Sequence, residues 1–231
     1  DRHVLYGLDI VIPEKEGVVR TYSWEELEEV EGIDAIVHLA GKAHDTKNET
    51  LAETYFSINT GLTRKVFDYF LKSSAKKFIF FSSVKAAADS VVGDMLTEEV
   101  IPTPKGPYGE SKIAAENYIL EQLKIGDGEL KMQGKQVYIL RPCMIHGPGN
   151  KGNLNLLYSV VKKGLPWPLG DFENRRSFTS VDNLCYVVNG LLEKEVASGI
   201  YHMADDEALS TNELIREMCE VMGKKAHIWR M

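Results

Sequence analysis

Tyr108 and Lys112, two residues with acid–base chemistry, stand four positions apart in the segment 107–112 (PYGESK). On a helix this spacing places both side chains on one face. Ser83, which follows an apolar run, could supply a hydroxyl group to the same space. A phenol has an unperturbed pKa of ~10, and a nearby ammonium favours its ionised form. These three residue types therefore suit proton transfer at an alcohol oxygen during a hydride transfer.

The Tyr–Lys spacing alone is also typical of an exposed helix start, so the surrounding sequence decides between the two interpretations. Three further segments stand around the pair: FIFF at 78–81, ILRP at 139–142 and HGPG at 146–149. In this order the segments resemble the extended short-chain dehydrogenase/reductases, specifically the NAD-dependent nucleotide-sugar epimerase/dehydratase family. The resemblance runs over essentially the whole chain. It implies that Ser83, Tyr108 and Lys112 are catalytic, and that Lys112 and a positive nicotinamide ring together lower the pKa of Tyr108 toward working pH.

Composition limits the partners of the chain. Its 231 residues, 44% of them hydrophobic, can bury the core of one large domain or slightly more. The net charge of −7 disfavours binding to nucleic acid. A small anionic ligand could still bind where cationic residues cluster, and Arg175-Arg176 is the best such cluster. No apolar run is long enough to span a bilayer, the first residues do not resemble a signal peptide, and the three cysteines show no metal-ligand spacing. We expect a cytoplasmic protein with no membrane, nucleic-acid or metal partner.

Short β-branched or aromatic runs alternate with amphipathic helical stretches, which predicts an α/β fold with a parallel sheet. The resemblance makes this a Rossmann-type doubly wound parallel sheet with a smaller α/β substrate lobe. Strands are predicted at 4–10, 35–39, 77–81, 136–140, 176–181 and 200–203. Helices are predicted at 23–30, 51–71, 108–124, 154–163, 182–192 (with Asp182 as its N-cap) and 210–222. The Rossmann core is expected over 1–147 plus about 181–206, and the substrate lobe over 148–180 plus 207–231, incomplete at its C-terminal end.

The cofactor site is expected from the position of its segments in this fold. A glycine-rich phosphate loop joins the first strand to the first helix, and a ribose-binding acid follows about 20 residues later. No Gly-x-x-Gly-x-x-Gly pattern occurs, so we expect the loop, its strand and its helix to lie before residue 1. Asp9 then occupies the acid position and favours NAD over NADP, unless it is an ordinary strand-end aspartate. The resemblance implies these cofactor-binding residues: Asp9, Leu39, Ala40, Gly41, Tyr108 and Lys112.

Substrate contacts are implied mainly for the second half of the chain. Asn153, at a helix start, resembles a family residue that holds the nucleotide diphosphate, and helix N-termini suit anions. Arg176 matches the family arginine that pairs with the pyrophosphate, because a guanidinium fork fits phosphate oxygens. Arg175 beside it is either a surface residue or a second cation. Lys85 either faces solvent or contacts a sugar hydroxyl, an N-acetyl oxygen or a phosphate.

Residues 82–85 (SSVK) help to decide which reaction of the family to expect. Dehydratases of the family carry an acidic pair in this segment, and that pair eliminates water. Because no carboxylate stands there, we expect an NAD-dependent 4-epimerase that oxidises a UDP-hexose or UDP-N-acetylhexosamine transiently at its 4-position. The subgroup is similar to UDP-glucose 4-epimerases of surface polysaccharide synthesis. A 4-dehydrogenase or 4-keto reductase that exchanges its cofactor is the main alternative, and a catalytically silent dinucleotide-binding regulator is a third. The resemblance also implies a homodimer through the helices at 51–71 and 108–124.

Overall fold

The chain forms two compact units in the computed structural model, which describes residues 3–12, 14–43, 51–125, 134–149 and 153–229. The first unit comprises Asp1–Arg141 and Glu195–Tyr201, and the second comprises Pro142–Lys194 and His202–Met231. Residues 142–147, 181–194 and 202–206, which we expected in the cofactor core, therefore belong to the second unit. The assignment of the units as a cofactor core and a substrate lobe stays a prediction.

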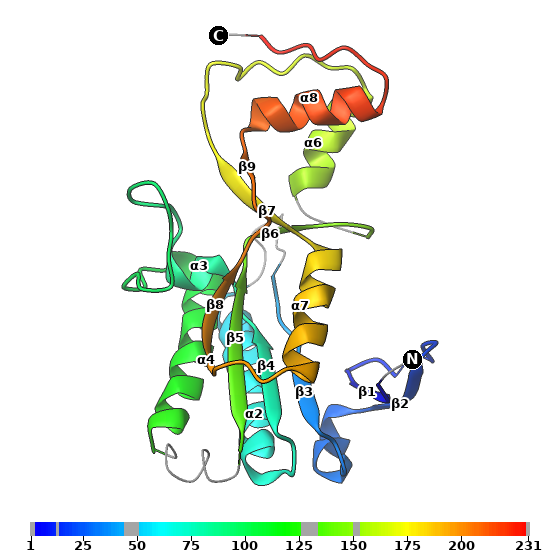
Figure 1. The fold of residues 1–231 in the computed structure, drawn as a ribbon, viewed down its shortest axis with the longest axis vertical. Coiled ribbons are helices and arrows are strands. Elements are labelled where there is room, and N and C mark those ends of the chain that lie inside the picture. The colour runs from blue at the N-terminus through cyan, green and yellow to red at the C-terminus, as the bar shows by residue number, and fades with distance from the viewer. Residues whose placement is uncertain (1–2, 13, 44–50, 126–133, 150–152, 230–231) are drawn as a thin grey trace. The chain divides into compact units, whose positions relative to one another are not determined.

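A four-stranded sheet, in the order β3-β4-β5-β8, contains β3 (Ala35–His38), β4 (Lys77–Phe81), β5 (Gln136–Pro142) and β8 (Gly199–Met203) (Figure 1). β4 runs parallel to both β3 and β5, with Phe78 opposite Ile36 on one side and Val137 on the other. The predicted parallel sheet is therefore confirmed. Parallel neighbours need a crossover connection, and α2 and α4 make the two crossovers on either side of β4.

One face of this sheet packs against α2 (Leu62–Lys72) and α4 (Gly106–Ile125). Alternate residues of a strand share a face, so Phe78 and Phe80 of β4 point toward the helices together. The buried core residues from the strands and the helices are Phe78, Phe80, Val137, Ile139, Val66, Phe67, Phe70, Ala115 and Ile119. The apolar residues of both helices pack into this core. The homodimer expected through these two helices stays a prediction. The expected cytoplasmic location also stays a prediction.

The helix predicted at 51–71 is built from three consecutive segments. α1 (Ala52–Tyr55) leads into a π-helical turn, η2 (Phe56–Gly61), which continues as α2. A π turn pairs residues five apart instead of four and occurs frequently at functional sites. Asn59, in the middle of this turn, is fully buried.

The remaining elements of the first unit are short. β1 (Leu5–Leu8) pairs in parallel with β2 (Val18–Tyr22). η1 (Trp24–Glu29), a 3-10 helix, begins with the predicted capping box, in which the Ser23 backbone N–H donates to the Glu26 carboxylate at 2.7 Å. α3 (Val84–Ala87) follows β4. Neither β2 nor α3 was predicted from the sequence.

The second unit combines a small sheet with three helices. β7 (Arg176–Ser180) lies between β6 (Met144–His146), to which it is parallel, and β9 (Ala208–Leu209), to which it is antiparallel. α6 (Asn153–Lys162) packs on α8 (Thr211–Val221), with Val161, Ile215 and Cys219 buried between them (Figure 1).

α7 (Val181–Glu193) begins two residues earlier than predicted, because its N-cap is Ser180, not Asp182. The Ser180 hydroxyl accepts a hydrogen bond from the Asn183 backbone N–H at 3.1 Å. β7 ends at Ser180, so the chain passes from strand to helix without a loop, and the expected cap lies inside the first turn. None of the helices in the described part of the chain is long and apolar enough to cross a bilayer.

Candidate active site

Ser83, Tyr108 and Lys112 come together where β4 ends and α4 begins. Ser83 follows β4 closely, and its hydroxyl lies near enough to the Tyr108 side chain to act on the pKa of the phenol. Tyr108 and Lys112 lie one turn apart near the start of α4. Lys112 Nζ donates to the carbonyl oxygen of Phe81, the last residue of β4, at 2.9 Å. The structure thus brings the three predicted catalytic residues to one place, and their roles stay predictions.

The electrostatics of this site are dominated by burial. Burial raises the pKa of Tyr108, and the nearby Ser83 hydroxyl opposes that rise. Burial also lowers the pKa of Lys112 to about 8, against the opposing effect of Glu116. The direction at Tyr108 is opposite to the lowering that we expected, because desolvation penalises the phenolate. The expected lowering depended on the charge of a nicotinamide ring as well as on Lys112.

Gly41 and Asn59 line the space beside Lys112. A Cβ atom at Gly41 would lie 3.0 Å from Lys112 Nζ and 3.1 Å from Asn59 Oδ1, so a larger residue would displace one of them. Asn59 Oδ1 accepts a hydrogen bond from Lys42 N at 2.7 Å, and Asn59 Nδ2 donates to Ser111 Oγ at 2.9 Å. Asn59 therefore ties the segment after β3 to the first turns of α4.

This geometry fits the cofactor segment that the sequence predicts. Leu39 is exposed, Ala40 is half-buried, and the absence of a side chain at Gly41 lets the Lys112 ammonium approach the backbone closely. A nicotinamide riboside needs a close backbone approach and hydrogen-bond donors for its hydroxyl groups, and both are present here. The cofactor contacts of these residues stay predictions.

Asp9 lies just after β1 and is exposed. Its carboxylate accepts a hydrogen bond from the Ile10 backbone N–H at 2.7 Å, and its own N–H donates to the Tyr22 carbonyl oxygen at 3.1 Å. Asp9 therefore stands at a strand end with an accessible carboxylate, as a ribose-binding acid requires. None of these hydrogen bonds connects it to Ser83 or Lys112.

Lys85 lies in α3, and its side chain is 47% exposed. Its ammonium pairs with the Asp89 carboxylate at 2.5 Å, one helical turn away. In this arrangement Lys85 faces solvent, which is one of the two interpretations of the sequence, and a substrate contact stays a prediction. Its carbonyl oxygen points at α4, where a Cβ atom at Gly109 would approach it to 2.5 Å.

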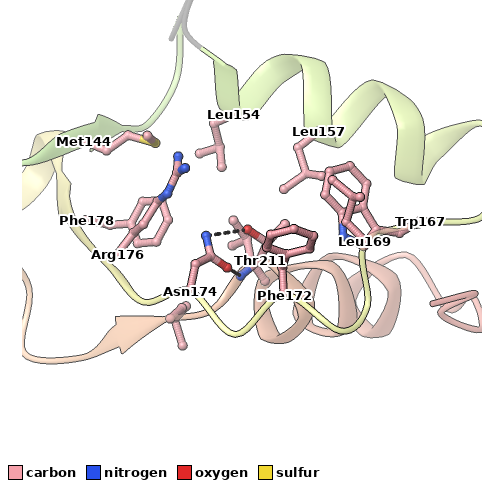
Figure 2. A pocket seen from close by; sticks show the side chains of 12 residues that line it. Met144, Leu154, Leu157, Trp167, Leu169, Phe172, Asn174, Arg176, Phe178 and Thr211 are labelled. Carbon is pink, nitrogen blue, oxygen red and sulfur yellow. Dashed lines mark hydrogen bonds between the residues drawn. The ribbon is translucent and has the colours of Figure 1, made fainter. Parts of the chain in front are cut away.

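The second unit contains a pocket of about 410 Å³ between α6, β7 and the segment that follows α6 (Figure 2). Arg176 lines it, and Figure 2 shows the guanidinium group on the same side of the pocket as Met144 and Leu154. Arg175 instead is 73% exposed and lies 3.9 Å from Glu213. The two arginines thus differ as the sequence analysis allowed. Asn153 begins α6, but its side chain lies outside the described part of the structure.

Most of the pocket lining was not predicted from the sequence. The apolar and aromatic lining residues are Met144, Leu154, Leu157, Trp167, Leu169, Phe172, Phe178, Leu209 and Leu214. Asn174 and Thr211 form the polar floor: Asn174 Nδ2 donates to Thr211 Oγ1 at 3.0 Å, and Thr211 N donates to Asn174 Oδ1 at 3.1 Å (Figure 2). The aromatic residues at 167 and 172, close before the arginine pair, were the available signal.

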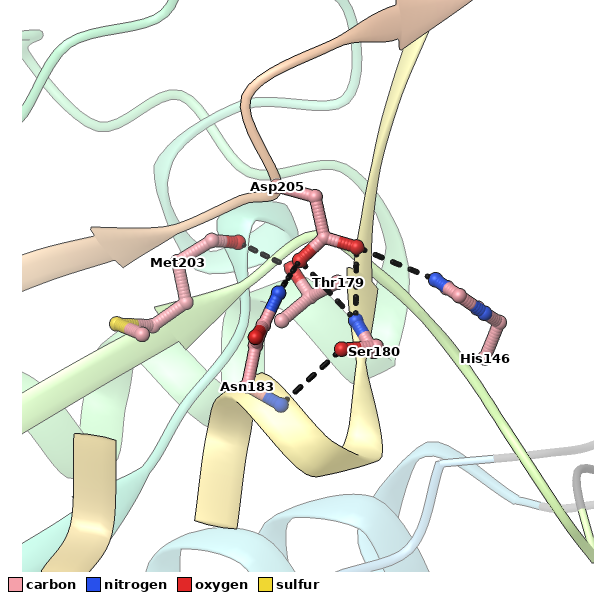
Figure 3. Close-up of polar contacts among 6 residues, drawn as sticks. All are labelled: His146, Thr179, Ser180, Asn183, Met203 and Asp205. Carbon is pink, nitrogen blue, oxygen red and sulfur yellow. Dashed lines mark hydrogen bonds and ion pairs between the residues drawn. The ribbon is translucent and has the colours of Figure 1, made fainter. Parts of the chain in front are cut away.

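A polar cluster around Asp205 was also missed (Figure 3). The Asp205 carboxylate accepts hydrogen bonds from Asn183 Nδ2 at 2.7 Å and from Ser180 N at 3.1 Å, and it contacts His146 Nε2 at 3.2 Å. These hydrogen bonds, that from Asn183 foremost, lower the pKa of Asp205. A carboxylate at the N-terminus of α7 is favoured by the helix dipole, so the cluster fastens α7 to β6 and β7. In the ranges that the structure describes, no group of three or more His, Cys, Asp or Glu residues could hold a metal ion.

Comparison with known proteins identifies the family. A UDP-glucose 4-epimerase from Vibrio cholerae is 32% identical over 194 residues, which cover 82% of this chain and 57% of the relative. An N-acetyl-alpha-D-glucosaminyl-diphospho-ditrans,octacis-undecaprenol 4-epimerase from Escherichia coli O157:H7 is 30% identical over 84% of this chain and 56% of the relative. The chain therefore spans a little over half the length of these curated relatives.

The fold is also shared with solved structures. The UDP-glucuronic acid 4-epimerase from Bacillus cereus, in complex with NAD, superposes with a TM-score of 0.79 at 19% identity, over 100% of this chain and 78% of that chain. This likeness confirms the predicted Rossmann-type α/β fold. Residues 18–204 match a family described as NAD dependent epimerase/dehydratase, in agreement with the resemblance seen in the sequence. The chain belongs to the NAD dependent epimerase/dehydratase family.

Proposed function

We propose that the protein is an NAD-dependent 4-epimerase of a UDP-hexose or UDP-N-acetylhexosamine. The observation that carries the proposal is the convergence of Ser83, Tyr108 and Lys112 at one place, with the backbone of Gly41 close to the Lys112 ammonium. The two relatives reported above, from Vibrio cholerae and Escherichia coli O157:H7, support it, because both are 4-epimerases of a hexose that is linked through a diphosphate.

Each of the three catalytic residues would have its own role in the transfer of one proton. Tyr108 takes the proton of the sugar 4-hydroxyl and later returns it. Ser83, close to the phenol, holds the same sugar oxygen. NAD, when bound, supplies the hydride acceptor and then the hydride donor at the 4-carbon. The Lys112 ammonium favours the phenolate and can donate to ribose hydroxyl groups. The reaction would invert the 4-carbon of the sugar with no net redox change.

The pocket of the second unit would hold the nucleotide diphosphate. Its Arg176 guanidinium can bind pyrophosphate oxygens bidentately. Its apolar and aromatic lining suits the faces of a planar base, and ligand pockets are typically apolar with a few placed polar groups. Asp9 would bind the adenosine ribose and select NAD over NADP. Dehydration is not proposed, because 82–85 (SSVK) provides no carboxylate.

The test uses the full-length protein with UDP-glucose and UDP-N-acetylglucosamine, and follows the sugar products by NMR and the cofactor by its absorbance at the NADH band. We expect the 4-epimer to form without net NADH, and Tyr108→Phe to abolish its formation. Stoichiometric NADH with a 4-keto product would instead show a 4-dehydrogenase. Conversion of an N-acetylglucosaminyl diphosphate polyprenol, but of neither UDP-sugar, would contradict the nucleotide part of the proposal. No conversion of any of these substrates would contradict the whole.

A further inference from the structure

Two charged side chains, Glu116 of α4 and Arg141 of β5, lie in the interior of the first unit at 0% and 2% exposure. Arg141 Nη2 lies 2.5 Å from Glu116 Oε2, and Arg141 Nε lies 3.1 and 3.2 Å from the two carboxylate oxygens. Both charges lose their hydration in this position, and apolar residues of similar volume often stabilise a fold equally well. Stability alone therefore does not account for the pair.

The Glu116 carboxylate also binds the end of β4. Ser82 Oγ donates a hydrogen bond to Glu116 Oε1. Ser82 N in turn donates to the carbonyl oxygen of Leu140, the residue before Arg141, at 2.7 Å. One carboxylate thus fastens the adjacent ends of β4 and β5 to α4.

The elements that Glu116 fastens are those that carry the reactive groups. Tyr108, Lys112 and Glu116 follow one another at intervals of four residues, so they share one face of α4. On the other side of the contact, Ser82 immediately precedes Ser83. The separation of the Ser83 hydroxyl from the Tyr108 phenol therefore depends on how closely Glu116 holds Ser82.

We propose that Glu116 and Arg141 are positioning residues of the active site. Their ion pair holds the end of β4 against α4 through Ser82. This contact keeps the Ser83 hydroxyl close to the Tyr108 phenol. The inference rests on the proposed function, in which Ser83 and Tyr108 act on the sugar oxygen.

Glu116 also influences the charge of Lys112. Its carboxylate favours the ammonium form and so opposes burial, which lowers the pKa of Lys112 to about 8. Without the carboxylate the pKa would fall further, and the neutral amine would appear at a lower pH. The titratable and charged groups that the structure describes around Lys112 and Tyr108 are His38, Tyr55, Glu116 and, beyond Glu116, Arg141.

The test compares two variants of the full-length protein. In Glu116→Met/Arg141→Met both charges are replaced by apolar side chains, so no unpaired charge is buried. We expect kcat to fall about tenfold or more with KM nearly unchanged, because a displacement of catalytic groups acts on the reaction step. We also expect the alkaline limb of the pH profile to move to lower pH, because Glu116 is the nearer of the two charges to Lys112. Wild-type kcat and pH profile in this variant would overturn the inference.

Lys135→Met is the matched control, since Lys135 is also a buried cation of the first unit. Its ammonium donates to the carbonyl oxygens of Phe70, Ser73 and Ala75, at the end of α2 and away from Ser83. This variant should lower Tm and leave kcat and the pH profile unchanged. The same loss of kcat in this control would show that general destabilisation explains the result, and would overturn the inference.

Two further measurements keep the test decisive. If the double variant does not fold, Ser82→Ala removes only the contact with Glu116, and kcat should fall about threefold or more. Unchanged kcat would refute the inference. If the wild-type protein converts no sugar, the proposed function has failed by itself. The pKa of Lys112, followed by NMR of 13Cε-labelled lysine, should still be lower in the double variant than in the wild type, and an unchanged value would overturn the inference.

Discussion

Gly109→Ala tests how closely α3 and α4 approach each other at the active site. A Cβ atom at Gly109 would lie 2.5 Å from the Lys85 carbonyl oxygen and 3.1 Å from Pro104 Cβ. The oxygen belongs to the backbone of α3, which directly follows Ser83, so it cannot turn away as the end of a side chain could. The added methyl group must therefore push the first turn of α4 and α3 apart.

The size of the effect follows from that contact. Ordinary contact begins at 3.4 Å, so the two backbones must separate by roughly 1 Å. Tyr108 is the neighbouring residue and moves with the turn, away from Ser83. A displacement of about 1 Å can cost about 100-fold in rate, and overpacking costs about 1–3 kcal/mol of stability. We expect kcat of sugar epimerisation to fall by about two orders of magnitude.

Gly190→Ala is the matched control for this variant. Gly190 lies within α7, and no atom would lie within 4 Å of its added Cβ. Alanine is the better helix former by about 1 kcal/mol at both positions, so the two variants differ only in the contact. Gly190→Ala should therefore stabilise the protein and leave kcat unchanged. Steady-state rates with a UDP-hexose decide the question, and a Gly109→Ala variant within twofold of wild type would refute the reasoning.

Three further predictions concern binding and stability. Arg176→Lys should raise KM for the nucleotide sugar about tenfold, because an ammonium cannot bind the diphosphate bidentately; Arg175→Ala, which changes an exposed side chain, should leave KM unchanged, and equal effects would contradict the assignment. Burial, and secondarily the charge of Lys112, lower the pKa of His38 from 6.5 to about 4. The unfolded chain then binds the proton first as pH falls, and the free energy of unfolding should drop by about 2 kcal/mol from pH 7 to 5; urea titrations of His38→Gln should show a flatter pH dependence, and an equally steep one would contradict this assignment. Lys135→Met should lower the free energy of unfolding by roughly 1–3 kcal/mol, since three carbonyl oxygens lose their hydrogen-bond donor. An unchanged midpoint of denaturation would show that water replaces the ammonium.

The elements around the catalytic residues were the most predictable from sequence. β4 was predicted with its observed bounds, because an apolar run of β-formers ends at two serines. The position of Tyr108 and Lys112 on one helix followed from their spacing. The predicted N-cap of α7 was wrong, because Ser180 and Asp182 are both residue types that favour the N-cap position. Only the direct passage from β7 into the helix selects the serine.

Two features of the site had no sequence signal that we could have used. The π turn at Phe56–Gly61 changes the hydrogen-bond register without a distinctive composition, so 51–71 reads as one regular helix. Glu116 and Arg141 are charged residues that sequence patterns place on the surface, and their burial depends on their meeting across α4 and β5. The apolar pocket had only the aromatic residues at 167 and 172 as a signal, because its lining residues, between 144 and 214, are brought together only in the folded second unit.

The π turn carries Asn59, whereas the core residues of the same helix lie on the segment that follows it. A regular α-helix turns by about 100° per residue, so deleting one residue from Phe56–Gly61 would swing Asn59 away from Lys42 and Ser111. Val66, Phe67 and Phe70, which lie beyond the turn on α2, could keep their places in the core. A single-codon deletion could thus silence such a chain while leaving it folded, and a later insertion at the same place could restore it.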